Sequence, residues 1–281
     1  MAAANPTSLE RRLLDWADRP HTARFYRDGQ LQQIEAALRD PRRTTQLSIG
    51  AWMLGTWYLG SGQARVLRSD LAGWDDVRIG QALQRTGLLL RAQRTARRTR
   101  HGDVPDLPVL QGANCIATGL ALDDPGGEPL CEIFRGLPDG AFNSASDGGA
   151  DRDAWPLFVR ELLELRAGRR PAVTPRLGPY GEILTGWLDD PALLARRLAR
   201  LLDHHLERTR GSPGSPAEFE EPGVLMFPVS VLAVRSVRAT LGLPMPKVEH
   251  PLMFTNLLHS APRGPWPADP LVARLERELR R

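Results

Sequence analysis

A run of side chains that can bind metals, Asp203-His204-His205-Leu206-Glu207, lies near the end of a predicted helix. Successive residues of a helix point about 100° apart, so His204 and His205 cannot face the same ligand. Asp203 and Glu207 are four residues apart and can share a face, but a zinc-binding helix needs two histidines at that spacing. The run therefore predicts a solvated helix end and no metal site.

Basic side chains gather at the end of another predicted helix, where Arg91, Arg94 and Arg98 follow one another at spacings of three and four. These arginines, here called the arginine stripe, share one helix face, and guanidinium groups match phosphate oxygens in geometry and charge. Cations at a helix C-terminus are also stabilised by the helix dipole, without any ligand. No aromatic residues interleave with them, as they do in many nucleic-acid-binding modules. We therefore predict a solvated helix end, with phosphate binding as the alternative.

The motifs of nucleotide-binding and covalent enzymes are incomplete in this chain. Gly50 and Gly55 have the spacing of a phosphate-binding loop, but Thr56 follows in place of the lysine that neutralises phosphates. No Gly-x-Ser-x-Gly sequence is present to expose a nucleophilic serine. Lys247 is the only lysine, so a Schiff base could form at no other position. The sequence thus predicts a non-enzymatic protein without a cofactor.

The two cysteines, Cys115 and Cys131, lie 16 residues apart in apolar helical settings. This spacing fits neither a zinc site nor a disulfide framework. Residues 1–9 are too polar for a secretory signal, and the most apolar run, residues 47–60, has 14 residues where a bilayer span takes about 20. We expect a cytoplasmic protein with reduced thiols and no membrane contact.

Apolar residues recur every three or four positions in nearly every segment, as in helices that bury one face. Alternation typical of strands is almost absent. The pattern predicts an all-α fold, an irregular bundle or an α-solenoid-like array of about ten to twelve antiparallel helices. The glycines at 50, 55 and 60 are expected to permit close helix packing. The predicted helices span residues 8–16, 30–38, 43–60, 65–71, 74–98, 107–122, 129–134, 155–165, 180–188, 191–207, 224–241 and 271–279.

A turn-rich, acidic stretch at residues 137–154 interrupts the helical pattern. We take it as the connection between an N-terminal helical subdomain, residues 1–136, and a C-terminal helical subdomain, residues 155–281. One continuous domain is the alternative, because 281 residues suit either one large domain or two modest ones.

The net charge of +4 is the sum of a basic first third, an acidic middle and a remainder, residues 161–281, that holds 17 bases against 14 acids. Residues 1–102 hold 17 arginines against 9 acids, and residues 103–160 hold 3 arginines against 10 acids. Such an uneven distribution can steer unlike partners, or the two blocks can neutralise each other across the fold. The sequence leaves both interpretations open.

The C-terminal hundred residues contain a recognisable order of elements. Residues 180–184 (YGEIL) precede a helix that opens at Asp190-Pro191 and ends at His204-His205; a polar gap follows, and then FPVSVLAVRSVRATLGLP and HPLMFTNLL. This arrangement resembles the all-helical family of bacterial polymorphic-toxin immunity proteins catalogued as immunity protein forty-nine. The resemblance implies a cytoplasmic, non-enzymatic protein that binds a cognate toxin domain and blocks it.

A toxin that acts on nucleic acid would present a basic cleft, which an acidic segment could cover. We therefore expect four aspartates of the acidic connection to contact the toxin. They are Asp139, Asp147, Asp151 and Asp153. The alternative is an arginine-rich, nucleic-acid-associated or regulatory helical protein that uses the arginine stripe.

Overall fold

The computed structural model describes residues 5–40, 43–98, 107–142, 154–210, 217–260 and 264–281. These residues form helices and connecting turns and contain no strand, which confirms the predicted all-α fold. The α-helices are α1 (Pro6–Asp18), α2 (Pro20–Ala23), α3 (Gly29–Leu38), α4 (Thr44–Leu67), α5 (Gly73–Arg98), α6 (Val109–Leu122), α7 (Glu128–Arg135), α8 (Ala154–Arg166), α9 (Pro179–Thr185), α10 (Pro191–Glu207), α11 (Pro222–Leu225), α12 (Val229–Thr240), α13 (Asn256–His259) and α14 (Pro270–Leu279). Shorter pieces are the π-helix η1 (Arg24–Asp28) and the 3₁₀ turns η3 (Asp139–Phe142), η5 (Pro175–Leu177) and η6 (Pro251–Phe254).

Several helices begin where the sequence supplies a cap. The carboxylate of Asp190 accepts a hydrogen bond from the Ala192 backbone N–H at 2.9 Å, and Pro191 occupies the first helical position of α10. Asp269 caps α14 in the same way. An acceptor side chain followed by proline satisfies the free N–H groups of the first turn, so these helix starts are predictable from sequence.

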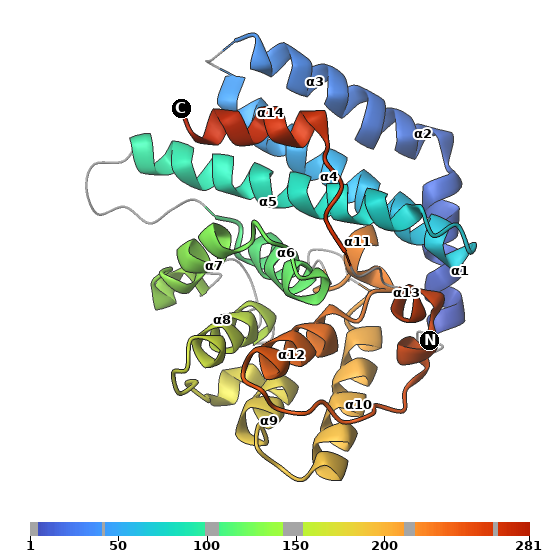
Figure 1. The fold of residues 1–281 in the computed structure, drawn as a ribbon, viewed down its shortest axis with the longest axis vertical. Coiled ribbons are helices and arrows are strands. Elements are labelled where there is room, and N and C mark those ends of the chain that lie inside the picture. The colour runs from blue at the N-terminus through green and yellow to red at the C-terminus, as the bar shows by residue number, and fades with distance from the viewer. Residues whose placement is uncertain (1–4, 41–42, 99–106, 143–153, 211–216, 261–263) are drawn as a thin grey trace.

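Two helices, α4 and α5, form a long antiparallel hairpin through the upper half of the molecule (Figure 1). A Cβ atom at Gly80 would lie 2.8 Å from the Gly55 carbonyl oxygen, and one at Gly62 would lie 2.6 Å from the Gly73 carbonyl oxygen. Only glycine permits backbones to approach this closely. We call these four glycines the glycine seam, and they confirm the expectation of close packing at Gly55.

The boundaries of three predicted helices are wrong. Residues 43–60 and 65–71 are expected from the sequence to be separate helices, but α4 continues through both Ser61 and Gly62 to Leu67. The glycine at 62 does not end the helix because it packs against α5. Residues 224–241 are expected to be one helix, but Pro228 separates α11 from α12. Proline lacks an N–H and cannot continue the preceding helix.

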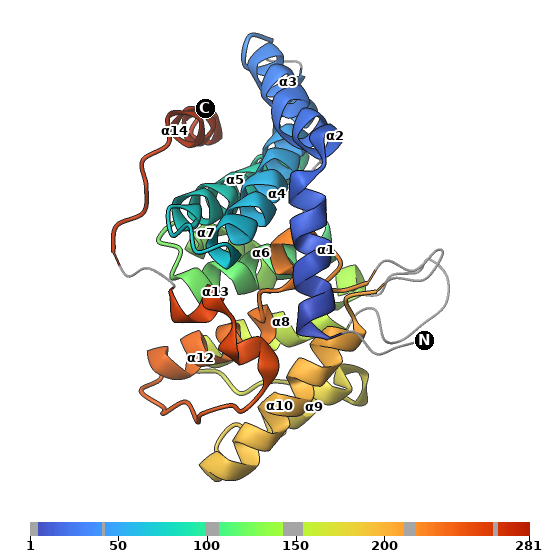
Figure 2. The same cartoon turned by 90° about the vertical axis from the view of Figure 1, so that its right-hand side faces the viewer.

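The hairpin is covered on both sides. In Figure 2, α14 lies on the side of α5, and α1 to α3 lie on the side of α4. Below the hairpin, α6 contacts α5 and leads into a second group that comprises α7, α8, α9, α10 and α12 (Figure 1). No helix in the described ranges is both long and apolar enough to cross a bilayer.

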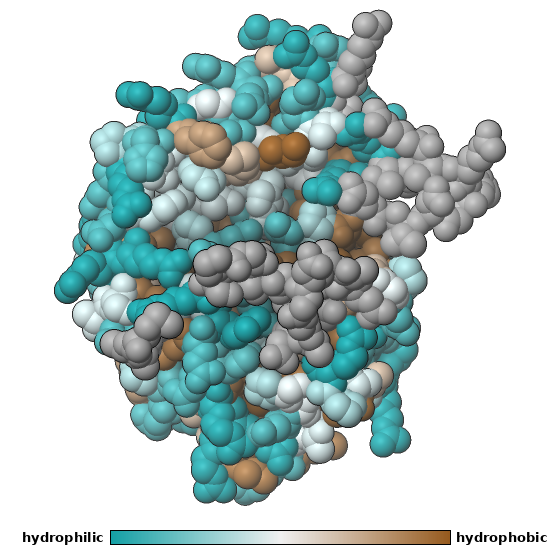
Figure 3. Space-filling view, turned by 180° about the vertical axis from the view of Figure 1, so that it is seen from behind, coloured by the Kyte–Doolittle hydropathy of each residue, from teal (hydrophilic) through white to brown (hydrophobic). Residues whose placement is uncertain are grey.

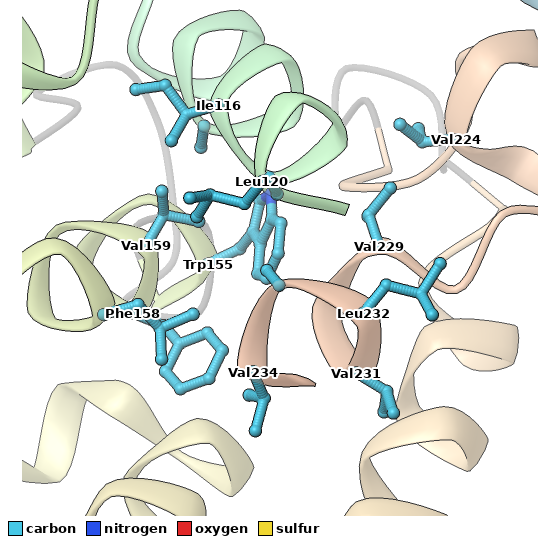
Figure 4. Close-up of a cluster of buried hydrophobic side chains, with 14 of the residues drawn as sticks. Ile116, Leu120, Trp155, Phe158, Val159, Val224, Val229, Val231, Leu232 and Val234 are labelled. Atoms are coloured by element: carbon cyan, nitrogen blue, oxygen red, sulfur yellow. The ribbon is translucent and has the colours of Figure 1, made fainter. Parts of the chain in front are cut away.

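The larger hydrophobic cluster joins α6, α8 and α12. Trp155 of α8 is fully buried in this cluster with Leu120 of α6 beside it, and Leu232 of α12 belongs to the same cluster (Figure 4). The Trp155 indole N–H donates to the Asn114 side-chain oxygen at 2.8 Å, which satisfies the one polar atom of the ring. This cluster also includes Leu9 and Val77 and therefore draws on both predicted subdomains.

A second, smaller cluster lies between α3, α4, α5 and α14. Leu275 of α14 is completely buried there against residues such as Ile34 and Leu83. The Arg274 guanidinium donates two hydrogen bonds to the Glu35 carboxylate, at 2.6 and 3.1 Å, and so ties α14 to α3. The C-terminal helix thus packs on the N-terminal hairpin. The division into subdomains at residues 137–154 stays a prediction.

Candidate functional site

The acidic connection is described only at its beginning. Asp139 lies in η3 with its side chain 89% exposed, and its carboxylate accepts a hydrogen bond from Arg160 Nη1 at 2.6 Å. Asp147, Asp151 and Asp153 lie outside the described residues. Asp139 is therefore accessible to a partner, but part of its charge is already balanced by Arg160.

The arginine stripe lies on the last part of α5. Arg91 and Arg94 are partly exposed, and Arg98 is the last residue of the helix, with a side chain outside the described set. Arg91 lines a small hollow of about 90 Å³ together with Trp52 and Ile49 of α4. The stripe thus borders an apolar surface, which the sequence did not predict.

Four aromatic rings meet on the outside of α1, η1 and α4. Trp16 contacts Tyr26 with ring centroids 5.6 Å apart and Trp57 at 5.8 Å, and Phe25 packs edge-on against Tyr26 at 5.1 Å. The Phe25 side chain is 55% exposed, and the other three are partly exposed. We call these four residues the aromatic surface.

Helix α4 extends this surface along its outer face. Ile49, Met53 and Trp57 lie at spacings of four, so they follow one another on one side of the helix, and Ile49 is 47% exposed. Figure 3 shows the molecule from behind, where brown side chains stand among teal ones in its upper part. The guanidinium of Arg27 lies 5.7 Å from the centre of the Trp57 ring. An exposed apolar surface that combines aromatic rings with arginine is typical of protein interfaces.

A polar pocket of about 310 Å³ opens between the hairpin and the lower helices. Its walls come from α5, α6, α7, α8 and α12 and from the loop that joins α6 to α7. Gln81 and Arg85 of α5 bond to Asp124 of that loop, and Asp123 beside it also lines the pocket. The sequence did not indicate this pocket, because its walls come from segments far apart in the chain.

A buried ion pair forms one wall of the polar pocket. The Arg85 guanidinium donates to the Asp124 carboxylate, whose side chain is fully buried, and also to Glu276 of α14 at 2.9 Å. Asp124 accepts two further hydrogen bonds, from the Gln81 side-chain amide at 3.2 Å and from the Gly126 N–H at 3.0 Å. Both members of the buried Arg85–Asp124 pair therefore have bonded partners, as a buried ion pair requires.

Both cysteines line the same pocket, although they are 16 residues apart in sequence. Cys115 is completely buried, and burial raises the pKa of its thiol far above the ordinary value. Burial also raises the pKa of the Cys131 thiol, to about 12. The thiolate is the nucleophilic form of cysteine, so both groups remain neutral thiols near pH 7. This wall of the pocket suits binding rather than covalent chemistry.

We expect both thiols to react slowly with the reagent DTNB at pH 8. The native rate should be at least about 100-fold lower than in urea, since the reagent needs an exposed thiolate. The rate should rise as pH increases toward the raised pKa of Cys131. Absorbance of the released thionitrobenzoate measures the reaction, and urea should release two equivalents. A fast stoichiometric reaction of the native protein would contradict the burial of Cys115 and Cys131.

The helix end around His204 and His205 is not simply solvated, contrary to the prediction. His205 is 1% exposed and stacks on Phe219 with ring centroids 4.1 Å apart. Burial lowers the pKa of His205 to about 4, so its ring is neutral near pH 7. The residues that the structure describes contain no group of three side chains that could hold a metal ion.

A buried carboxylate follows the polar gap at residue 218. Glu218 accepts a hydrogen bond from the Tyr180 hydroxyl at 2.7 Å, and His204 Nε2 lies 3.7 Å from the same carboxylate. The pKa of Tyr180 is raised well above its ordinary value, first by burial and then by the charge of Glu218, so the phenol keeps its proton. The backbone carbonyl of Glu218 accepts from the Asn114 amide at 3.1 Å. These bonds hold the segment after the gap against α6 and α9.

The sequence did not predict a contact between His250 and Asp203, because the two residues lie 47 positions apart in the chain. His250 Nε2 lies 3.3 Å from the Asp203 carboxylate, and its Nδ1 accepts from the Leu252 N–H at 3.2 Å. Both nitrogens therefore have partners, and the ring closes the first turn of η6 against α10. The contact holds η6 against α10, and it leaves no nitrogen of the His250 ring free to bind a ligand.

Comparison with known protein families, with curated protein sequences and with solved structures gave no match for this chain. The resemblance of the C-terminal hundred residues to an immunity-protein family therefore stays a prediction.

Proposed function

We propose that this protein is a cytoplasmic immunity protein, which binds a cognate toxin domain and neutralises it by covering its active site. The observation that carries the proposal is the aromatic surface. Trp16, Tyr26 and Trp57 are in contact on the outside of the fold, with Phe25 exposed beside them. Tryptophan, tyrosine and arginine are the residues most enriched among the energetic centres of protein interfaces.

The aromatic surface and the residues around it have the composition that a stable protein interface needs. A typical complex buries about 1,600 Å² in total, with a central apolar patch inside a polar rim. The rings of the aromatic surface and the apolar side chains of Ile49 and Met53 supply the patch, and Arg24 and Arg27 lie at its edge. Rigid rings lose little entropy on binding, because each has only two rotatable side-chain bonds.

Asp139 supplies a second point of contact in this proposal. Its carboxylate is exposed, and it begins the acidic connection that we expect to face a basic toxin cleft. The aromatic surface would then contribute most of the affinity, and the aspartates would contribute to the association rate and to the choice of partner.

The proposal is tested first with the protein encoded by the adjacent reading frame. We expect a secreted toxin domain whose expression stops growth, and we expect co-expression of this chain to restore growth. Purified toxin and this chain should form a stable complex in size-exclusion chromatography. A neighbour that is a housekeeping enzyme, or a toxin that neither binds this chain nor is neutralised by it, would remove the proposal.

Replacing Phe25 and Trp57 together by alanine is expected to weaken toxin binding by at least about 30-fold, which corresponds to about 2 kcal/mol. Titration calorimetry with the toxin domain measures the change. Phe254→Ala is the matched control, because Phe254 is 52% exposed on η6 and does not belong to the aromatic surface. Equal affinities of the double variant and this control would exclude the aromatic surface from the interface.

Charge reversal of the four aspartates tests the acidic contact separately. The variant that carries arginine at Asp139, Asp147, Asp151 and Asp153 should bind the toxin more slowly, and most clearly at low salt. Unchanged affinity together with unchanged protection would remove this segment from the interface.

The nucleic-acid alternative has one observation in its favour, the position of Arg91 beside Trp52 in the small hollow. A guanidinium next to an indole can hold a phosphate and a stacked base. This alternative predicts binding to single-stranded DNA that falls steeply between about 50 and 200 mM salt. The immunity proposal, by contrast, predicts that binding to the toxin is largely independent of the arginine stripe.

A further inference from the structure

We propose that the polar pocket between α5, α6, α7, α8 and α12 binds a small organic cation, an alkylamine or a guanidinium compound. This proposal concerns a different part of the molecule from the aromatic surface and does not depend on the toxin. Four properties of the described residues carry it: the size of the pocket, its charge, a buried acceptor without a donor, and an apolar floor.

The pocket has the size of a ligand site. Its volume of about 310 Å³ lies at the lower end of the range for sites that bind small molecules. The walls are helices, and the Arg85–Asp124 pair links α5 to the loop that follows α6. A pocket built in this way exists before the ligand arrives, so binding requires little reorganisation.

The charge of the lining favours a cation. Arg85 bonds to both Asp124 and Glu276, so this group carries one excess negative charge, and Glu128 is paired with Arg166 at 2.8 Å. Asp123 is different, because its carboxylate has no hydrogen-bond or ion-pair partner among the described residues of the lining. One negative charge at the mouth of the pocket is therefore left without a cation.

A buried acceptor deeper in the wall also lacks a donor. The amide nitrogen of Gln81 donates to the Cys115 carbonyl oxygen at 3.0 Å and to Asp124 at 3.2 Å. These two acceptors fix the orientation of the amide, since a flipped side chain would bring oxygen against oxygen. The Gln81 Oε1 atom is then buried, without a hydrogen-bond partner among the described residues. The oxygen itself is not accessible from the lumen, so it adds an uncompensated negative partial charge to the wall, which favours a cation in the pocket.

The remaining lining suits the carbon part of such a ligand and does not suit a metal ion. Ile116, Leu120 and Leu130 give the pocket an apolar floor against which an alkyl chain can pack. The two thiols keep their protons, because burial raises their pKa values, and a protonated thiol is a poor metal ligand. Within the described ranges no three metal-binding side chains come together.

The test is titration calorimetry of the full chain with 1,5-diaminopentane and with agmatine. We expect both to bind with dissociation constants below about 1 mM. The diol 1,5-pentanediol, which has the same carbon chain without charge, and the dianion glutarate should bind at least about 10-fold more weakly. Absence of binding by both amines, or binding of the diol as tight as that of the amines, overturns the proposal.

Asp123→Asn is the decisive variant. Asp123 has a φ of 55°, a left-handed conformation that asparagine tolerates well, so the fold should be unaffected. Amine affinity should fall by at least about 10-fold, since the charge at the mouth is lost. Asp139→Asn is the matched control at another exposed aspartate and should leave the affinity unchanged. Equal affinities of the two variants overturn the proposed contact.

A second variant blocks the pocket from an exposed residue of its lining. Thr240 is exposed at the end of α12, where a cation is favoured by the helix dipole, so Thr240→Arg should fold normally. The added guanidinium would occupy the mouth and compete for Asp123. Amine binding should be abolished, and an affinity equal to that of the unmodified chain would count against this pocket.

Discussion

Replacing Gly80 by leucine is expected to lower the free energy of unfolding by more than about 4 kcal/mol. A Cβ atom there would lie 2.6 Å from the Leu59 backbone nitrogen and 2.8 Å from the Gly55 carbonyl oxygen. These are backbone atoms inside a helix and cannot rotate away, so the two helices would have to separate. Leucine is nearly as good a helix former as alanine, so the loss would not come from helix propensity.

Gly140→Leu is the matched control for this experiment. Gly140 lies in η3 and is exposed, and a Cβ atom added there would meet nothing within 4 Å, so the same change should alter stability by less than about 0.5 kcal/mol. Gly80→Ala should fall between the two. Urea denaturation followed by circular dichroism gives all three values. Similar midpoints for the leucine variants at 80 and 140 would show that α4 and α5 do not approach as closely as the glycine seam requires.

The glycine seam illustrates what sequence could and could not predict. Gly55 interrupts an apolar helical run, and its cost in helix propensity already indicated close packing. Nothing local indicated that Gly73 and Gly80 would lie opposite the glycines of the preceding helix. Which glycines face each other depends on the register of the hairpin, and that register follows from the packing of two whole helices rather than from the residues around any one glycine.

Helix starts are predicted well because their signals are local. An acceptor followed by proline, as at Asp190-Pro191, marks a first turn whatever lies around it. The break expected after residue 60 is wrong for the opposite reason. Ser61 and Gly62 are weak helix formers, but packing of Gly62 against α5 keeps the helix intact. Tertiary contacts override local propensity at this position.

The candidate sites are harder to predict than the fold, because their residues come from distant segments. The aromatic surface needs Trp16 beside Trp57, and the polar pocket needs Gln81 beside Asp124. Residue spacing along one helix contains no information about such pairs. His205 shows the same limit, since its burial depends on Phe219, a residue beyond the polar gap.

Within the described part of the chain, an ion pair joins the opposed charge blocks of the sequence inside the fold. Arg85 belongs to the basic first third, and Asp124 belongs to the acidic middle. Their ion pair lies in the wall of the polar pocket and has side chains that are 7% and 0% exposed. At this position the two blocks neutralise each other, as one of the two interpretations of the sequence requires. Asp139, by contrast, remains at the surface, so the neutralisation is partial.

Asp124→Ala is expected to lower the free energy of unfolding by about 3–5 kcal/mol, because it leaves Arg85 buried with only the partly exposed Glu276 as a partner. The donors on Gln81 and Gly126 would also lose their acceptor, and an unpaired buried donor carries its full cost of desolvation. Urea denaturation measures the loss.

The double variant Arg85→Met/Asp124→Ala separates the charge effect from the loss of packing. It should be more stable than Asp124→Ala alone, since no buried cation is left without a partner. Glu249→Ala is the surface control: Lys247 and Glu249 are bonded at 2.5 Å but are 79% and 64% exposed, so the change should cost less than about 1 kcal/mol. If Asp124→Ala lowered the free energy of unfolding no more than this control, the Arg85–Asp124 pair would not be a buried ion pair that joins α5 to the loop after α6. The shape of the polar pocket would then not depend on this pair.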